Sequence, residues 1–244
     1  HPMPVPARTI GDHQAEYVLL LGMLASTAGK IGREIYTLMK QEFGEVEEPV
    51  PAGTVGSSTM PQKRNPKLSQ DIIAAAAQIR ALVPLALEAM QTEHEADRTT
   101  SIMMSRAIVQ ACELTGDVLQ RLVVLFDGLQ VFPARMRENL ELSGGLIMAE
   151  ALMLELGKQI GRQRAHDAVY EAAQASATQS RPFRETLAED PHVSAGLTAA
   201  QVDALLDPAR YTGLCRQFAE RGAAMGRDIS AAIEARASGR NRPP

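Results

Sequence analysis

Prolines divide this sequence into long uninterrupted stretches, and this feature constrains the fold more than any other. A proline inside an α-helix costs about 3 kcal/mol, so prolines tend to mark the ends of helices. Residues 7–48 contain no proline, residues 67–130 contain only Pro84, and residues 134–181 contain none. The sequence therefore leaves room for three long helical stretches.

Apolar side chains recur in residues 17–129 at alternating steps of three and four, which places them on one stripe of each helix. The predicted seams are Tyr17, Leu21, Leu24, Ala28, Ile31, Ile35 and Leu38; then Leu68, Ile72, Ala75, Ile79, Leu82 and Ala86; then Met104, Ile108, Ala111, Val118, Leu122, Leu125 and Leu129. Thr115 interrupts the third seam, and Pro84 is expected to kink the second helix without ending it. No alternating run of β-branched residues predicts a strand. The predicted fold class is all-α, a bundle of long helices.

The pattern changes after Pro133, where shorter helical units begin. The predicted helices cover residues 146–156, 163–179, 183–188, 199–206 and 214–237. We therefore predict two domains. Residues 1–132 form part of a central helical bundle that carries a chemically distinct loop at 53–66, and residues 133–244 form a smaller C-terminal helical domain.

Composition excludes several classes of protein. Of the 244 residues, 45% are hydrophobic and 22% are charged, which is enough apolar material for a sizeable core and argues against disorder. A net charge of −4 and the lack of a dense basic block argue against a nucleic-acid partner. Two cysteines, Cys112 and Cys215, make no disulfide framework, so a reducing compartment, the cytoplasm, is expected. No apolar run approaches the roughly 20 residues of a membrane span, and no membrane partner is predicted.

The loop at residues 53–66, called the signature segment below, differs from its surroundings. It combines glycines and hydroxyl side chains with the cations Lys63 and Arg64, and Pro66 opens the next helix. Because helix N-termini favour negative charge, a ligand carboxylate is expected near Lys63, Asn65 and the start of that helix. A solvated loop between helices is the open alternative, since such loops share this composition.

The string from Gly56 to Pro66, GSSTMPQKRNP, resembles the GSSxMPxKxNP signature of the fumarase/aspartase superfamily. Residues 44–49 look like the stretch that precedes this signature in the adenylosuccinate lyase and 3-carboxy-cis,cis-muconate cycloisomerase branch. Four further stretches look most like the cycloisomerase members: residues 128–131, 135–140, 145–150 and 206–213. The resemblance covers nearly the whole chain.

This resemblance implies removal of a proton from the carbon beside a carboxylate, followed by cleavage of a C–N or C–O bond or by lactone opening or closing. It makes Ser57 the candidate general base, and Lys63 and Asn65 candidate stabilisers of the dianion that forms. Ser58, Thr59 and Met60 are carried over as candidate substrate-binding residues. The implied substrate is a small polycarboxylate, and neither a cofactor nor a metal is expected.

Arg8 and His94 are weaker candidates for substrate binding. Arg8 stands near an arginine that this branch carries before its first long central helix, where it could hold a carboxylate in a bidentate contact. His94 lies in a Glu-His-Glu stretch that resembles the cycloisomerases. A surface arginine and a polar residue at a helix end are the open alternatives. The match fails from Ala96 onward, so the substrate is not fixed.

The resemblance also implies a homotetramer whose active sites each use three subunits. Family members are roughly twice this long, and we expect a fragment that assembles but does not turn over substrate alone. An adenylosuccinate lyase-like or other C–N or C–O lyase remains an alternative, as does a helical scaffold without catalysis, because fold does not fix function.

Overall fold

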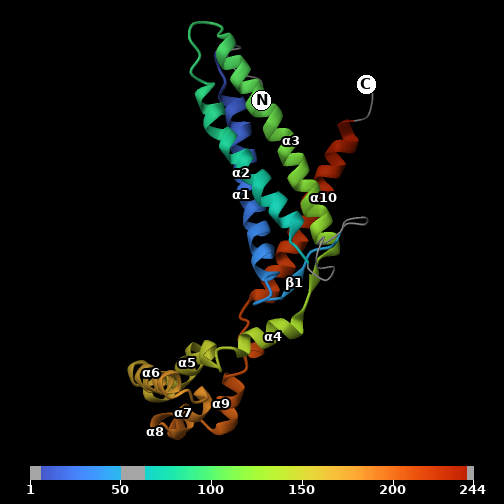
Figure 1. The fold of residues 1–244 in the computed structure, drawn as a ribbon. Coiled ribbons are helices and arrows are strands. Elements are labelled where there is room, and N and C mark those ends of the chain that lie inside the picture. The colour runs from blue at the N-terminus through green and yellow to red at the C-terminus, as the bar shows by residue number, and fades with distance from the viewer. Residues whose placement is uncertain (1–6, 51–63, 241–244) are drawn as a thin grey trace. The chain divides into compact units, whose positions relative to one another are not determined.

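The structure, a computed structural model, describes residues 7–50 and 64–240 of the chain (Figure 1). Within these ranges the chain forms ten α-helices, two short 3-10 helices and two strands of two residues each. It divides into two compact units between Asn139 and Leu140, a few residues beyond the boundary predicted at 132/133. Each unit has a hydrophobic core of its own and is described by itself.

Three long helices build the N-terminal unit: α1 (Asp12–Leu38), α2 (Lys67–Glu88) and α3 (Arg98–Gly128). They pack against one another side by side and alternate in direction along the chain (Figure 1). The start of α4 (Pro133–Glu141) completes this unit. The predicted bundle of long helices is confirmed.

The buried face of α1 is not the one that the large apolar residues indicated. Tyr17 and Leu24 of the predicted seam are 46% and 42% exposed. The buried side of the helix consists of Ala15, Val18, Gly22, Ala25, Ala28, Gly29, Gly32 and Ile35. A Cβ atom on Gly32 would lie 3.2 Å from side-chain atoms of Ile72 and Ile73, so α1 and α2 approach closely through small residues. The prediction ranked residues by size, whereas close helix contact here depends on small ones.

The seams predicted for α2 and α3 agree much better with the structure. Five of the six α2 positions are buried, and Leu82 packs partly buried against the core. Pro84 lies inside α2 and does not end it. In α3 the buried residues include Met104, Ala111, Val118 and Leu125 of the predicted seam, and Thr115 is buried among them.

Helix α2 is also the one helix, among the residues that the structure describes, that is long and apolar enough to cross a membrane by length and composition. The sequence had indicated no such candidate, because its apolar residues form no unbroken run. A core helix passes the same criterion, and α2 packs along both α1 and α3. The finding therefore carries no membrane assignment.

A short ribbon corrects the expectation that the chain has no strand. Strand β1 (Val46–Glu47) pairs antiparallel with β2 (Gln130–Val131), with Val46 opposite Val131 and Glu47 opposite Gln130. The backbone amide of Phe132 extends the pairing by donating to the carbonyl of Glu45. The ribbon joins the chain just before the signature segment to the end of α3.

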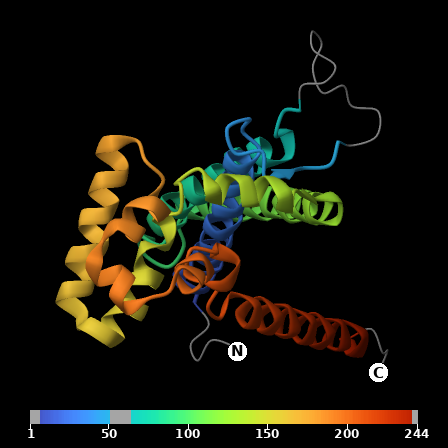
Figure 2. The same cartoon turned by 90° about the horizontal axis from the view of Figure 1, so that it is seen from below.

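Figure 2 shows the shorter helices of the C-terminal unit gathered into a cluster (yellow to orange). They are η1 (Leu146–Met148), α5 (Ala149–Ile160), α6 (Arg162–Gln179), α7 (Phe183–Glu189), α8 (Pro191–Gly196) and α9 (Ala199–Leu205). The unit also contains η2 (Pro208–Arg210) and the long helix α10 (Cys215–Arg240). Phe183 and Leu187 are fully buried at the centre of its core. The five predicted helices are present, whereas α4 and α8 were missed because each begins at a proline and is short.

Candidate functional site

The signature segment leaves strand β1 and returns to helix α2. Ser57, Ser58, Thr59, Met60 and Lys63 lie outside the described residues. Asn65 is described: its carbonyl accepts a hydrogen bond from the backbone amide of Lys67 at 2.8 Å, directly before α2 begins. The contacts described below are therefore those of the residues that flank positions 51–63, chiefly Glu47, Glu48, Pro49 and Arg64.

A carboxylate of the protein itself occupies the N-terminus of α2. The Glu48 side chain accepts hydrogen bonds from the backbone amides of Leu68 (2.8 Å) and Ser69 (3.1 Å) and from the hydroxyl of Ser69 (2.9 Å). Glu48 is only 4% exposed and Ser69 is fully buried. The anion expected at this helix start is thus Glu48, and these two amides are not available to a substrate carboxylate.

Two further contacts lie beside Glu48. The guanidinium of Arg64, at the returning end, pairs with the Glu47 carboxylate at 3.4 Å, and both side chains are partly exposed. Pro49 lies so close to Gly128, the last residue of α3, that a Cβ atom on Gly128 would stand 2.6 Å from the proline Cβ. The described residues on either side of 51–63 are therefore held against the bundle and the ribbon.

The turn before β1 is held by the first residues of α4. Arg135 donates to the backbone carbonyls of Glu42 (3.0 Å) and Phe43 (2.9 Å). The side-chain amide of Asn139 donates to the Phe43 carbonyl and, at 2.8 Å, to the Glu45 carboxylate. These contacts give a structural role to the 135–140 stretch that resembles the cycloisomerases.

Arg121 ties α3 to α2 near the same end of the bundle. Its guanidinium contacts Asp71 of α2 at 2.7 Å and Asp117 of α3 at 2.8 Å. The hydrogen bond that Arg121 donates to the Asp117 carboxylate, more than any other contact, raises the pKa of Arg121 above its usual value. The arginine thus stays charged and keeps the two helices in register.

Arg8 and His94 lie at the opposite end of the three-helix bundle. Arg8 precedes α1 and His94 follows α2, and both are exposed. The two segments meet there, because a Cβ atom on Gly11 would lie 3.7 Å from the Met90 Cα. His94 has a φ of 56°, a left-handed conformation that is uncommon outside glycine and often marks a functional loop.

A groove of about 760 Å³ opens beside this end, between the last turns of α2 and the first turns of α3. Arg98, Ser101, Ser105 and Arg106 contribute its polar groups, and apolar side chains such as Ile102 form the rest of its lining. Neither arginine has an ion-pair partner within residues 7–50 and 64–240. The groove therefore offers two unpaired cations and two hydroxyls to an anionic ligand.

Sequence reasoning missed this groove, whose polar side chains lie in the stretch from Ala96 onward where the family match fails. Part of the signal was present, since steps of three and four residues place Arg98, Ser101 and Ser105 on one face of a helix.

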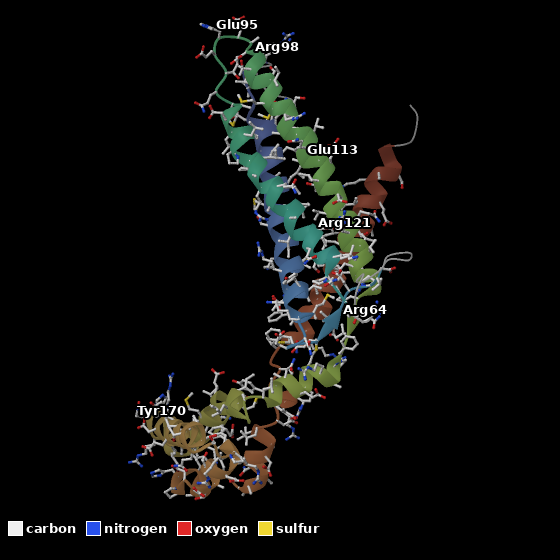
Figure 3. All side chains as sticks on the ribbon, viewed as in Figure 1. Arg64, Glu95, Arg98, Glu113, Arg121 and Tyr170 are labelled. Atoms are coloured by element: carbon white, nitrogen blue, oxygen red, sulfur yellow. The ribbon has the colours of Figure 1, made fainter. Side chains whose placement is uncertain are left out.

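The predicted site residues are not brought together within one chain. Helix α2 has 22 residues, so Asn65 and His94 are separated by roughly 33 Å along its axis at 1.5 Å per residue. In Figure 3, Arg64 lies near β1 whereas Glu95 and Arg98 lie at the far end of the bundle. A site that uses both ends needs groups from a second chain.

No three His, Cys, Asp or Glu side chains gather into a metal-binding group in the part of the chain that the structure describes. The two exposed cysteines are free there.

Comparison with known proteins gives the family. The sequence model of the lyase family matches residues 5–81, and that of the adenylosuccinate lyase C-terminus matches residues 145–222. The 3-carboxy-cis,cis-muconate cycloisomerase of Pseudomonas aeruginosa is 41% identical over 219 residues, which cover 90% of this chain and 48% of that protein. The chain belongs to the fumarase/aspartase superfamily.

Other superfamily members agree with this assignment. The N-acetyl-S-(2-succino)cysteine lyase of Enterococcus italicus is 40% identical, over 86% of this chain and 47% of that protein. The crystal structure of a 3-carboxy-cis,cis-muconate lactonizing enzyme from Pseudomonas putida superposes with a TM-score of 0.84 and 36% identity, over 93% of this chain and 51% of that one. The chain spans about half the length of the curated relatives that it matches.

Proposed function

We propose that the chain contributes the signature segment to a lyase or cycloisomerase that acts on a small polycarboxylate. The enzyme proposed is most like a 3-carboxy-cis,cis-muconate cycloisomerase. The observation that carries this proposal is the complete signature, with Ser57, Lys63 and Asn65, between the Glu48 contact with α2 and the Glu47–Arg64 ion pair. Relatives named as cycloisomerases over most of the chain support the choice of substrate class.

In the proposed reaction, Ser57 removes the proton beside a carboxylate of the substrate. The resulting carbanion is stable only if its charge spreads into that carboxylate, and the dianion then needs cations and donors placed in advance. Lys63 and Asn65 have this role in the proposal. A serine is a weak base at its ordinary pKa, so its surroundings must be dry and positively charged when it acts.

The proposed site combines more than one chain. Groups for substrate binding at the Arg8 and His94 end, together with the Arg98 groove, stand about one length of α2 away from the signature segment of the same chain, roughly 33 Å. A second copy that supplies the other end would complete the site, which fits a homotetramer. We propose this assembly in the cytoplasm, without a cofactor.

A second candidate is an adenylosuccinate lyase-like C–N lyase. The observation that favours it is the match of residues 145–222 to the adenylosuccinate lyase C-terminus. A helical scaffold without catalysis would keep the bundle and lose the chemistry of the signature segment.

The test is an assay of the full-length protein against 3-carboxy-cis,cis-muconate, adenylosuccinate, argininosuccinate and fumarate, followed by absorbance. Ser57→Ala is expected to lower kcat by about 10²–10⁴-fold, the usual contribution of a general base. Size-exclusion chromatography with light scattering should show the same oligomer for both proteins. Ser194→Ala, which removes an exposed hydroxyl in the C-terminal unit, is the matched control and should keep its activity.

The choice among substrates follows from the same assay. Turnover of adenylosuccinate but not of 3-carboxy-cis,cis-muconate would favour the second candidate. A Ser57→Ala protein with the activity of the parent would refute the proposed mechanism, and a parent inactive on all four compounds would favour the scaffold.

A further inference from the structure

We propose that Glu48 is a positioning residue for Asn65, the candidate stabiliser of the dianion: its buried carboxylate ties the chain that follows β1 to the start of α2, directly after Asn65. This inference rests on the proposed function, since it assigns Glu48 a part in the same reaction. Glu48 itself is not a catalytic residue in this proposal, because its carboxylate is fully engaged by Leu68 and Ser69.

The strength of the tie follows from its burial and its partners. A buried carboxylate is stable only when hydrogen bonds and positive potential compensate for its lost hydration. Glu48 has three donors and lies at a helix N-terminus, where the dipole favours negative charge. Hydrogen bonds to a charged group of this kind are roughly twice as strong as neutral ones. The contact is therefore well suited to hold two segments together.

The position of Glu48 in the sequence separates this role from ordinary helix capping. The residue at the N-cap of α2 is Pro66, and it makes no side-chain cap. A serine or aspartate there would satisfy the same amides without joining two segments. Glu48 instead reaches Leu68 across 20 sequence positions, so one contact both caps α2 and joins it to the chain that follows β1.

The neighbouring tie is weaker. The Glu47–Arg64 ion pair also joins the two ends, but its side chains are 30% and 48% exposed. Exposed ion pairs contribute little because water screens them. The buried Glu48 contact is thus the one expected to control how the two ends are held.

The consequence for the reaction concerns geometry. Asn65 stands three residues before Leu68, whose amide Glu48 binds, and its carbonyl accepts a hydrogen bond from the Lys67 amide at the same helix start. A displacement of about 1 Å in a reacting group can cost about 100-fold in rate. Loss of the tie should therefore lower kcat much more than it changes KM.

Three variants of the full-length protein test the tie. Glu48→Ala removes it, Glu48→Gln keeps one acceptor and nearly the same volume, and Ser69→Ala removes only the hydroxyl donor. The matched control is Ser176→Ala, which removes a buried hydroxyl that donates to the Arg181 carbonyl in the C-terminal unit.

The first measurement is steady-state turnover of 3-carboxy-cis,cis-muconate, at a temperature well below the melting temperature of every variant. We expect kcat to fall by about 100-fold in Glu48→Ala and about 10-fold in Glu48→Gln, with KM changed less than about threefold. Ser69→Ala should lie between Glu48→Gln and the parent, and Ser176→Ala should equal the parent. A role in folding alone would leave kcat unchanged at this temperature, so partial rescue by Gln is not expected from such a role.

The second measurement is the rate of tryptic cleavage after Lys63 and Arg64, which needs no activity. Cleavage should become several-fold faster in Glu48→Ala and Glu48→Gln but not in Ser176→Ala, with unchanged far-ultraviolet circular dichroism. If Glu48→Ala does not fold, Glu48→Gln and Ser69→Ala decide the matter.

The outcomes separate the two proposals. An active Ser57→Ala protein overturns the proposed function, and tryptic cleavage then still tests the tie. An inactive Ser57→Ala together with parental kcat in the Glu48 variants overturns only the role of Glu48. Unchanged tryptic cleavage in folded Glu48→Gln and Ser69→Ala overturns the tie itself.

Discussion

Replacement of Gly128 by alanine should destabilise the N-terminal unit, although alanine is the better helix former. A Cβ atom at this position would stand 2.6 Å and 2.8 Å from the Cβ and Cγ atoms of Pro49. Favourable carbon contacts lie at about 3.5–4.0 Å, so the added methyl group is roughly 1 Å too close to a rigid ring. Pro49 directly follows Glu48, whose carboxylate is held by α2. Neither partner has room to move without shifting backbone.

The magnitude follows from two opposing terms. The gain in helix propensity from glycine to alanine is at most about 1 kcal/mol and is smaller at the last residue of a helix. Overpacking of a well-packed contact costs about 1–3 kcal/mol. The expected net loss of unfolding free energy is about 1–2 kcal/mol, which lowers the melting temperature by about 2–8 °C.

The assay is thermal unfolding followed by far-ultraviolet circular dichroism, with Gly116→Ala as the matched control on the same helix. Apart from its own helix backbone and chain neighbours, no heavy atom in residues 7–50 and 64–240 lies within 4 Å of a Cβ atom built on Gly116. Its substitution should therefore raise the unfolding free energy by up to about 1 kcal/mol. If Gly128→Ala melts no lower than the parent, the inferred close contact with Pro49 is wrong.

Two further predictions concern the C-terminal unit. Phe183→Ala should cost about 3–5 kcal/mol of unfolding free energy, since Phe183 is fully buried. Phe218→Ala, at a side chain that is 63% exposed, should cost less than about 0.5 kcal/mol. Denaturant unfolding measures both costs, and equal values would contradict the assigned core. The hydrogen bond from Arg184 lowers the pKa of Asp203 below its ordinary value of 3.8. A lowered carboxyl pKa stabilises the fold above the unfolded value, and the contribution is lost as the pH falls through the folded value. Asp203→Asn should therefore lower the melting temperature at about pH 7 but not well below pH 3.8. An equal loss of melting temperature at the two pH values would count against a stabilising Arg184–Asp203 ion pair.

Periodicity and proline placement were enough to predict the long helices, though not α4 and α8, because they report directly on which residues can share a helix face. They failed for α1, where Tyr17 and Leu24 are exposed and Gly22 and Gly32 are buried. Small residues carry little hydrophobic signal, so a sequence pattern ranks them last even where they let two helices approach. The ribbon of β1 and β2 was missed because two residues are too few to show alternation.

The signature segment was recognisable from its sequence, but the way it is held was not. Glu48 was one acid in an acidic run, and its partners at Leu68 and Ser69 lie 20 and 21 positions away. No local pattern encodes such a contact. The roles proposed for Ser57, Lys63, Asn65, Arg8 and His94 remain predictions.

The length of α2 sets the spacing between the two ends of the bundle. Because the helix rises 1.5 Å and turns 100° per residue, each residue inserted into it would lengthen the spacing between Asn65 and His94 and swing one end around the axis relative to the other. Seven residues, close to two full turns, restore the facing but still add about 10 Å. If the proposed assembly brings the two ends of different copies together, the length of α2 is constrained by that spacing as well as by the packing of the helix.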